Sequence, residues 1–262
     1  SFDYCADQHV LALAEPGQIA ALSKYQLSDF SYFKSGQKPY PEVKGSAEEA
    51  LALQVDVVIR AFGGGPALQR LVSPFGIEVV TLGYGSSLEA GRENLLVAGR
   101  ALGREAAAKE LLRQTDARLS EVRTTWQDTP EAERPSAIYL TPSGATTGSG
   151  TFVDDVITAA GFRNAASADG KTGWHMLDIE SLITTPPDAI IAAFFDLKSS
   201  ATNNWSLARH HLIRRLMEEK PTVMVPGRLI SCTSWTAVEA VEMINRLYLK
   251  VAGPKPDREA SP

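Results

Sequence analysis

Residues Ser86–Trp126 read SSLEAGRENLLVAGRALGREAAAKELLRQTDARLSEVRTTW, without a proline. Apolar residues recur in this stretch at spacings typical of a helix face. They are Leu88, Leu95, Leu96, Val97, Leu102, Leu111, Leu112, Leu119 and Val122. Gly103 interrupts the pattern, which therefore predicts two helices, over 87–102 and 104–125. The second would be about 30 Å long, since each residue of an α-helix adds 1.5 Å.

Short apolar runs lie on both sides of these helices. Because the runs are continuous rather than alternating, they are typical of strands buried on both faces of a parallel sheet. They cover 57–59, 79–82, 137–140, 189–194 and 222–225. Helical patterns alternate with these runs, over 7–13, 151–160, 179–184 and 236–250. A further helix is expected to begin at Ser46, which can form a capping box with Glu49. This alternation predicts an α/β fold.

The series of strands and helices occurs twice, over 1–85 and 135–250. We expect two Rossmann-like α/β lobes joined by a long backbone helix, with a ligand cleft between the lobes. The expected parts are an N-terminal lobe over 1–103, a connecting helix over 104–126, a C-terminal lobe over 127–252 and a flexible tail over 253–262. The alternative is one doubly wound domain whose longest helix packs on its sheet.

Composition excludes two classes of protein. The chain has 262 residues, of which 44% are hydrophobic and 22% charged, as in ordinary globular proteins. Its net charge is −5 and no Lys/Arg run exceeds a pair, whereas nucleic-acid binders carry a basic face. Its longest apolar runs, such as Ala189–Phe195, are far shorter than the roughly 20 residues that cross a bilayer.

The chain holds two cysteines, Cys5 and Cys232. They lack C-x-x-C spacing, so a zinc site would need histidine ligands as well. In an exported protein we expect one disulfide, and in a cytosolic protein two free thiols. Cys5 follows the apolar segment 1–4 and Cys232 follows the strand over 222–225, so we expect a bond that ties the two lobes at the cleft. The chain starts at Ser1 without Met, as after removal of a signal peptide; a shortened chain explains this equally well.

Several motifs together resemble one family. GSAEEALALQVDVVI at 45–59, FGIEVV at 75–80, GRALGREAAA at 99–108 and TPPDAII at 185–191 occur in the family's order and spacing. The chain resembles, over nearly its whole length, the helical-backbone (class III) periplasmic solute-binding proteins of ABC importers. The resemblance implies a periplasmic monomer that captures a bulky metal chelate, a ferric siderophore or haem, and delivers it to the importer's permease in the membrane. Vitamin B12 is the alternative ligand. No catalysis and no cofactor are implied.

The chain departs from the family in its docking residues. Such proteins carry one surface Glu per lobe that pairs with arginines of the permease. Neither 66–70 nor 231–235 holds an acid, and Gln54 and Val55 stand before Asp56 without the usual proline.

Five aromatic residues lie in loops or at strand ends, where binding residues concentrate. They are Tyr25, Phe62, Tyr84, Trp174 and Phe195. Taken singly, each could equally lie at the edge of a core; as a set, they predict an aromatic lining of the cleft.

Three polar or small residues complete the expected ligand site. Gly63 follows a strand, and a glycine there lets the backbone approach a bulky ligand. Ser149 lies in the loop over 141–151, which would offer hydrogen bonds to an anion or be a plain solvent loop. Arg228 follows the strand over 222–225, where it would bind carboxylate or catecholate oxygens or lie on the surface.

Two other classes of protein remain as alternatives. A nucleotide-dependent α/β enzyme would need a dinucleotide fingerprint, but Gly63–Gly65 is followed by Pro66 and opens no G-x-G-x-x-G helix. No G-x-S-x-G elbow occurs either, so a hydrolase has no support. The third class is an interaction protein that kept the fold and lost its ligand.

Overall fold

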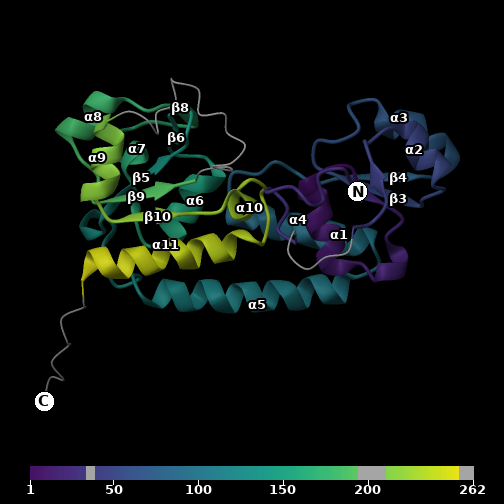
Figure 1. Cartoon of the computed structure of the whole chain (residues 1–262). Coiled ribbons are helices and arrows are strands. Elements are labelled where there is room, and N and C mark those ends of the chain that lie inside the picture. Colours follow the sequence, from purple (N-terminus) through teal and green to yellow (C-terminus); the bar gives the residue numbers. More distant parts are fainter. Residues whose placement is uncertain (34–38, 194–210, 254–262) are drawn as a thin grey trace, which may run out of the picture. The chain divides into compact units, whose positions relative to one another are not determined.

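A computed structural model describes residues 1–33, 39–193 and 211–253 (Figure 1). The chain divides into two compact α/β units. Unit 1 holds Ser1–Ala117 and Gly227–Val238, and unit 2 holds Arg118–Pro226 and Glu239–Pro262. We expected 127–252 to stay in one lobe, but the chain returns to unit 1 over 227–238. All but the first residue of the expected tail lies outside the described residues.

Unit 1 contains two short parallel sheets. One pairs β1 (Leu22–Ser23) with β2 (Glu42–Val43), and the other pairs β3 (Val57–Arg60) with β4 (Glu78–Thr81). Val58 and Ile59 are buried in β3, which fits the expectation of strands covered on both faces. The strands predicted over 57–59 and 79–82 are confirmed within one residue.

The helices of unit 1 follow local signals in the sequence. They are α1 (Tyr4–Leu13), α2 (Ala47–Ala52), α3 (Leu68–Val72), α4 (Leu88–Ala101), α10 (Gly227–Ile230), the first part of α5 (Glu105–Thr124), and the 3₁₀ turns η1 (Pro16–Gln18) and η2 (Ser73–Phe75). The capping box is confirmed, because Ser46 and Glu49 each accept from the other's backbone N–H ahead of α2. Gly103 lies between α4 and α5 with a φ of 65°, which favours glycine.

Unit 2 is built on a four-stranded parallel sheet in the order β10-β9-β5-β7. These strands are β5 (Ser136–Leu140), β7 (Arg163–Asn164), β9 (Ala189–Ala192) and β10 (Thr222–Met224). A separate antiparallel pair joins β6 (Ala145–Thr147) to β8 (Trp174–Met176). The runs predicted over 137–140, 189–194 and 222–225 therefore form neighbouring strands, as far as the structure describes them.

Helices cover both faces of the sheet of unit 2. They are α6 (Phe152–Ala159), α7 (Ala165–Ala168), α8 (Ile179–Thr184), α9 (His211–Glu219), α11 (Ala237–Ala252) and the 3₁₀ turn η3 (Glu131–Glu133). One core cluster packs Ile138 and Ile190 of the sheet against Leu182 of α8 and Ile213 of α9. In Figure 1, α11 runs along the other face.

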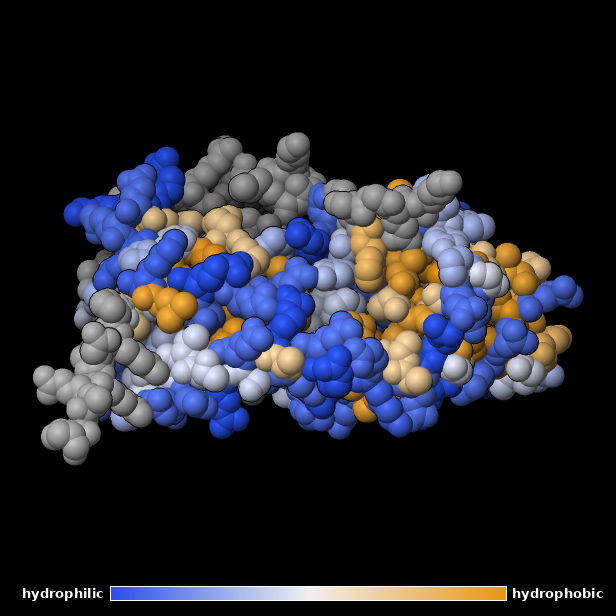
Figure 2. All heavy atoms as spheres, turned by 90° about the horizontal axis from the view of Figure 1, so that it is seen from below, coloured by the Kyte–Doolittle hydropathy of each residue, from blue (hydrophilic) through white to orange (hydrophobic). Residues whose placement is uncertain are grey.

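One face of the protein is largely polar. Figure 2 shows hydrophilic residues over much of one face, with apolar residues gathered within unit 1. Among the described helices, none combines the length and the apolar character that a membrane crossing requires.

A disulfide joins Cys5 and Cys232, whose Cα atoms are 5.5 Å apart. Its expected position was wrong in two respects. Cys5 lies in the first turn of α1 rather than at a strand end, because Asp3 caps the helix by accepting the N–H of Ala6. Cys232 lies in the segment that returns to unit 1, so the bond closes this unit on itself instead of tying two lobes. The hydroxyl of Thr233 donates one hydrogen bond to the Gly85 carbonyl (2.9 Å), which holds the same segment.

Candidate functional site

Five aromatic side chains of unit 1 form one cluster, which we call the aromatic group. Its members are Tyr4, Tyr25, Phe30, Phe62 and Tyr84. Three of them follow the carboxyl ends of parallel strands: Tyr25 follows β1, Phe62 follows β3 and Tyr84 follows β4. Ligands of open α/β sheets bind at such strand ends.

Tyr4 lies at the centre of the aromatic group. Its ring stacks on Phe30 at 5.4 Å between centroids and meets Phe62 edge-on at 5.3 Å. Tyr25 lies 6.5 Å from Tyr4, and Tyr84 lies 6.3 Å from Phe62. These are ordinary separations of interacting rings.

The group remains open to solvent although its rings touch. Tyr25 is 44% exposed, Phe62 42% and Tyr84 68%. These are the three unit 1 aromatics that the sequence singled out, and the structure brings them together. Tyr4 and Phe30 were missed, because the helical pattern was expected to begin only at Asp7 and nothing marked Phe30 locally.

Asp3 holds the loop that carries Phe62. One oxygen of its buried carboxylate accepts three successive backbone N–H groups, from Ala61 (2.7 Å), Phe62 (2.9 Å) and Gly63 (2.9 Å). The other oxygen accepts the N–H of Ala6 at 2.9 Å. Hydrogen bonds to an ionised acceptor are among the stronger ones, so this carboxylate fixes the loop against the start of α1.

Gly63 has a packing role that the sequence did not predict. A Cβ atom there would lie 2.3 Å from the carbonyl oxygen of Phe2. The space on the Cβ side of Gly63 is therefore filled by the chain itself. Glycine is needed at position 63 because the backbone of Phe2 passes close to the backbone there.

Charged side chains near the aromatic group are only partly available to a ligand. Lys24 places its Nζ 4.9 Å from the centroid of Tyr25. Arg60 donates to the carbonyl of Gly63 (3.0 Å) and to the hydroxyl of Thr81 (3.2 Å), so its guanidinium serves the loop. Partial burial raises the pKa of Tyr84 to about 12, with smaller contributions from Tyr4 and Asp3.

Arg228 lies elsewhere than expected. It belongs to α10, within the segment that returns to unit 1, and not to the second lobe. It is half-buried, and among the residues that the structure describes no carboxylate forms a salt bridge with it. Its guanidinium can therefore accept an anionic group.

Unit 2 places Ser149 just beyond the end of β6 and Trp174 on β8, the strand that pairs with β6. Thr147 of β6 pairs with Trp174 of β8, and Ser149 bridges to Thr172 just beyond. Trp174 is 56% exposed and packs edge-on against the buried Tyr139 at 5.8 Å.

Within unit 2 the hydroxyl of Ser149 donates to the Lys171 carbonyl at 3.3 Å, so it is already engaged as a donor. Phe195 lies outside the described residues. Over the described parts of the chain, no three His, Cys, Asp or Glu side chains meet as a metal site would require.

A profile of the family described as periplasmic binding protein matches residues 3–216. The chain therefore belongs to the periplasmic binding protein family, as a class III member with two lobes. This confirms the resemblance found in the sequence, and with it the prediction of a binding protein rather than an enzyme.

Individual relatives are distant. An uncharacterized ABC transporter substrate-binding lipoprotein of Bacillus subtilis (strain 168), YvrC, is 24% identical over 181 residues, 64% of this chain and 56% of that protein. The chain thus spans little more than half the length of this curated relative.

Two solved structures from Vibrio cholerae share the fold. The periplasmic heme-binding protein HutB is 18% identical, with a TM-score of 0.74 over 93% of this chain and 95% of that chain. The periplasmic vitamin B12 binding protein BtuF is 17% identical, with a TM-score of 0.65 over 97% of this chain and 96% of that chain.

Proposed function

We propose that the protein is the extracytoplasmic solute-binding component of an ABC importer, that its ligand is a bulky iron chelate, and that haem is the best candidate. The aromatic group carries this proposal, because it offers three exposed rings on one surface of unit 1. Flat apolar macrocycles gain most from aromatic faces. Membership of the periplasmic binding protein family and the name of the Bacillus relative, a substrate-binding lipoprotein, support the importer as partner.

Polar groups would orient such a ligand. Haem carries two carboxylates, and a carboxylate suits Lys24 or Arg228, whose guanidinium forms no salt bridge among the described residues. Arg60 is less suited because it already donates to Gly63 and Thr81. The proposal therefore assigns recognition of the anionic edge to Lys24 and Arg228, and burial of the ring to the aromatic group.

Titration with haemin tests the proposal, followed by the Soret absorbance. Phe62→Ala and Tyr84→Ala should each weaken binding about tenfold, since one lost ring contact is worth on the order of 1 kcal/mol or more. Phe75→Ala is the matched control, because Phe75 is also an exposed aromatic residue of unit 1 (67%) but lies outside the aromatic group. Equal affinity of all three variants would contradict the assignment of this surface.

The same titration separates the ligand classes. A ferric siderophore or cyanocobalamin that binds while haemin does not would keep the importer assignment and change the ligand. Binding of a dinucleotide, with no chelate bound, would favour the enzyme class instead. If no chelate binds, the interaction protein that lost its ligand becomes the better description.

Trp174 is a second proposed ligand contact, on unit 2. Its exposed indole should be quenched by haemin, and Trp174→Ala should remove part of this quenching and lower the affinity several-fold. Met224→Ala, another exposed apolar residue of unit 2 (42%), serves as control. Unchanged affinity of the Trp174→Ala protein would remove Trp174 from the proposed ligand contacts.

A further inference from the structure

Tyr84 lies between two glycines, Gly83 and Gly85, in the loop that joins β4 to α4. Its ring is 68% exposed and lies 6.3 Å from the ring of Phe62. Because glycine leaves the backbone free to adopt many conformations, the local sequence does not fix where this ring points. Contacts from other parts of unit 1 therefore have to hold the loop.

Asn94 of α4 holds the glycine before Tyr84. The side-chain oxygen of Asn94 accepts the N–H of Gly83 at 2.8 Å, and its side-chain nitrogen donates to the carbonyl of Gly83 at 2.9 Å. The same nitrogen also donates to the Thr233 carbonyl at 3.0 Å, so both of its hydrogens are used. Asn94 is buried, which strengthens these bonds because water competes little for their atoms.

Thr233 holds the glycine after Tyr84. It belongs to the segment over 227–238, which packs in unit 1 and which we call the returning segment. The hydroxyl of Thr233 donates to the Gly85 carbonyl at 2.9 Å. A Cβ atom added to Gly85 would meet the Cβ of Ala90 and would lie 3.4 Å from the methyl group of Thr233. Gly85 therefore packs closely against both α4 and the returning segment.

The returning segment is itself fixed on both sides of Thr233. Cys232 forms the disulfide with Cys5 of α1. Trp235 belongs to one core cluster together with buried residues of α1 and α4. Thr233 thus extends from a rigid anchor, and support of this kind is what pre-organises a binding site.

We propose that Asn94 and Thr233 are positioning residues that hold Tyr84 in the aromatic group by fixing the glycines on either side of it. This role rests on the proposed function of the aromatic group as a ligand surface. The two residues act through Tyr84 and not by touching the ligand. A ring that is held before binding loses less freedom on binding, so its support raises the affinity. The returning segment, which follows β10 of unit 2 along the chain, thereby helps to build the ligand surface of unit 1.

Nuclear Overhauser cross-peaks between the rings of Tyr84 and Phe62 test this placement without any ligand. Asn94→Ala removes all three hydrogen bonds of the side chain, and Thr233→Val replaces the hydroxyl by a methyl group of similar size. The cross-peaks should be lost in Asn94→Ala and should weaken in Thr233→Val. Thr233→Ser keeps the hydroxyl and should retain the cross-peaks of the native chain.

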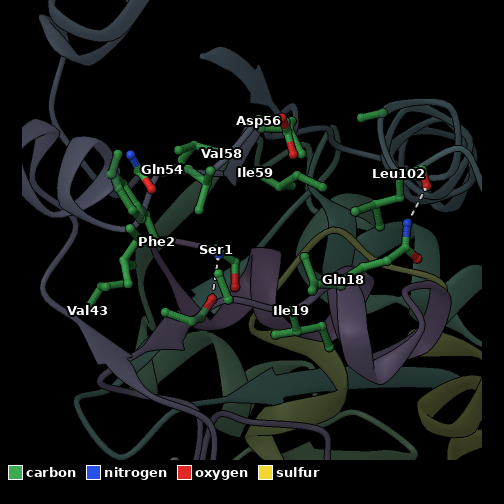
Figure 3. Close-up of a pocket in the computed structure, with 18 of the residues that line it drawn as sticks. Ser1, Phe2, Gln18, Ile19, Val43, Gln54, Asp56, Val58, Ile59 and Leu102 are labelled. Carbon is green, nitrogen blue, oxygen red and sulfur yellow. Dashed lines mark hydrogen bonds between the residues drawn. The ribbon is translucent and has the colours of Figure 1, made fainter. Parts of the chain in front are cut away.

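Gln18→Ala is the matched control for Asn94→Ala. The side chain of Gln18 also accepts one backbone N–H, that of Glu15 at 2.9 Å, and donates to one carbonyl, that of Leu102 at 3.2 Å. Figure 3 shows the bond to Leu102 beside a pocket of about 520 Å³, which no member of the aromatic group lines. Gln18→Ala should therefore leave the cross-peaks unchanged.

Thr115→Val is the matched control for Thr233→Val. The hydroxyl of Thr115 donates to the Leu111 carbonyl at 2.9 Å, within the part of α5 that belongs to unit 1. The change removes the same kind of bond at a place that does not support the aromatic group. It should leave both the cross-peaks and the affinity for haemin unchanged.

Titration with haemin tests the role in binding. Asn94→Ala and Thr233→Val should each weaken binding by about three- to tenfold, and by no more than Tyr84→Ala does, because they act through that ring. In a chain that already carries Tyr84→Ala, the same changes should have no further effect, whereas the effects of independent sites would add. Thr233→Ser should bind haemin as the native chain does.

Each result decides for or against the two positioning residues. Lost or weakened cross-peaks, with a loss of affinity that disappears in the Tyr84→Ala chain, support the proposal. Unchanged cross-peaks in both Asn94→Ala and Thr233→Val overturn it, and so does a loss of affinity that is equally large in the Tyr84→Ala chain. Lost cross-peaks with unchanged affinity overturn the role in binding. If the native chain binds no haemin, haem fails as the ligand, and the cross-peaks still decide whether these residues hold Tyr84.

Discussion

Replacing Asp3 with alanine tests how the start of the chain builds the proposed ligand surface. The change removes the acceptor of four backbone N–H groups, those of Ala6, Ala61, Phe62 and Gly63, at 2.7–2.9 Å. Loss of a helix cap costs about 1 kcal/mol, and each buried donor left without a partner costs about 1–3 kcal/mol. Water can reach the exposed Phe62 loop, so we expect a loss of about 3–4 kcal/mol rather than the full sum.

Urea unfolding at pH 7 measures this loss. Asp3→Asn keeps one carbonyl acceptor and should lose about half as much, roughly 2 kcal/mol. Asp169→Ala is the control, because the side chain of Asp169 is exposed and makes no hydrogen bond among the described residues. This change should alter the free energy of unfolding by less than about 0.5 kcal/mol. A loss below about 1 kcal/mol for Asp3→Ala would refute the idea that this carboxylate holds the loop. The affinity of the Asp3→Ala protein for haemin should fall as well, since the loop that carries Phe62 loses the carboxylate that holds it.

Three further predictions concern unit 1. Replacing Cys5 and Cys232 together by alanine should lower the free energy of unfolding by about 5 kcal/mol in the chain-entropy account, because the disulfide joins residues 227 positions apart. Thermal unfolding with and without reductant measures this loss, and equal midpoints would contradict the prediction. Backbone N–H groups lower the pKa of Glu49 in the folded state. The stabilisation that Glu49 contributes is therefore complete above the ordinary pKa of 4.5 and is lost as the pH falls through the lowered folded pKa. Glu49→Gln should reduce the dependence of the free energy of unfolding in urea on acid pH, and an unchanged dependence would count against this role of Glu49. Gly63→Ala should lower the free energy of unfolding by about 2 kcal/mol or more through overpacking. Gly17→Ala should be tolerated, because an added Cβ there would have no atom within 4 Å. Equal urea midpoints for the two variants would contradict the packing argument.

Local signals in the sequence determined most elements of the fold. The strand at Val57–Arg60 contains the continuous apolar run over 57–59, and α8 coincides with the helix expected over 179–184. The capping box of Ser46 and Glu49 spans four residues, so it needs no distant contact. The break at Gly103 likewise separates two helices because of the backbone freedom of one residue. The four family motifs, taken together, indicated the class of protein, which no single helix or strand indicates.

Part of the candidate site was also readable from the sequence. Phe62 and Tyr84 follow the predicted strands over 57–59 and 79–82, and neighbouring parallel strands carry their carboxyl ends to one edge, so the gathering of these two rings followed from the α/β pattern. Tyr25 follows β1, a strand of the other sheet that the sequence did not predict. Tyr4 could not be found this way. It lies in the first turn of a helix, and only the rings packed against it mark it as the centre of the group.

Tertiary structure alone decided where distant segments meet. Residues 227–238 follow β10 of unit 2 along the chain but pack in unit 1, so Cys232 and Arg228 lie in the other unit than the sequence suggested. Asp3 binds a loop almost 60 residues away, and Gly63 is a glycine because Phe2 passes beside it. Such contacts leave no periodicity in the sequence, because each depends on long-range packing and not on the conformational preference of neighbouring residues.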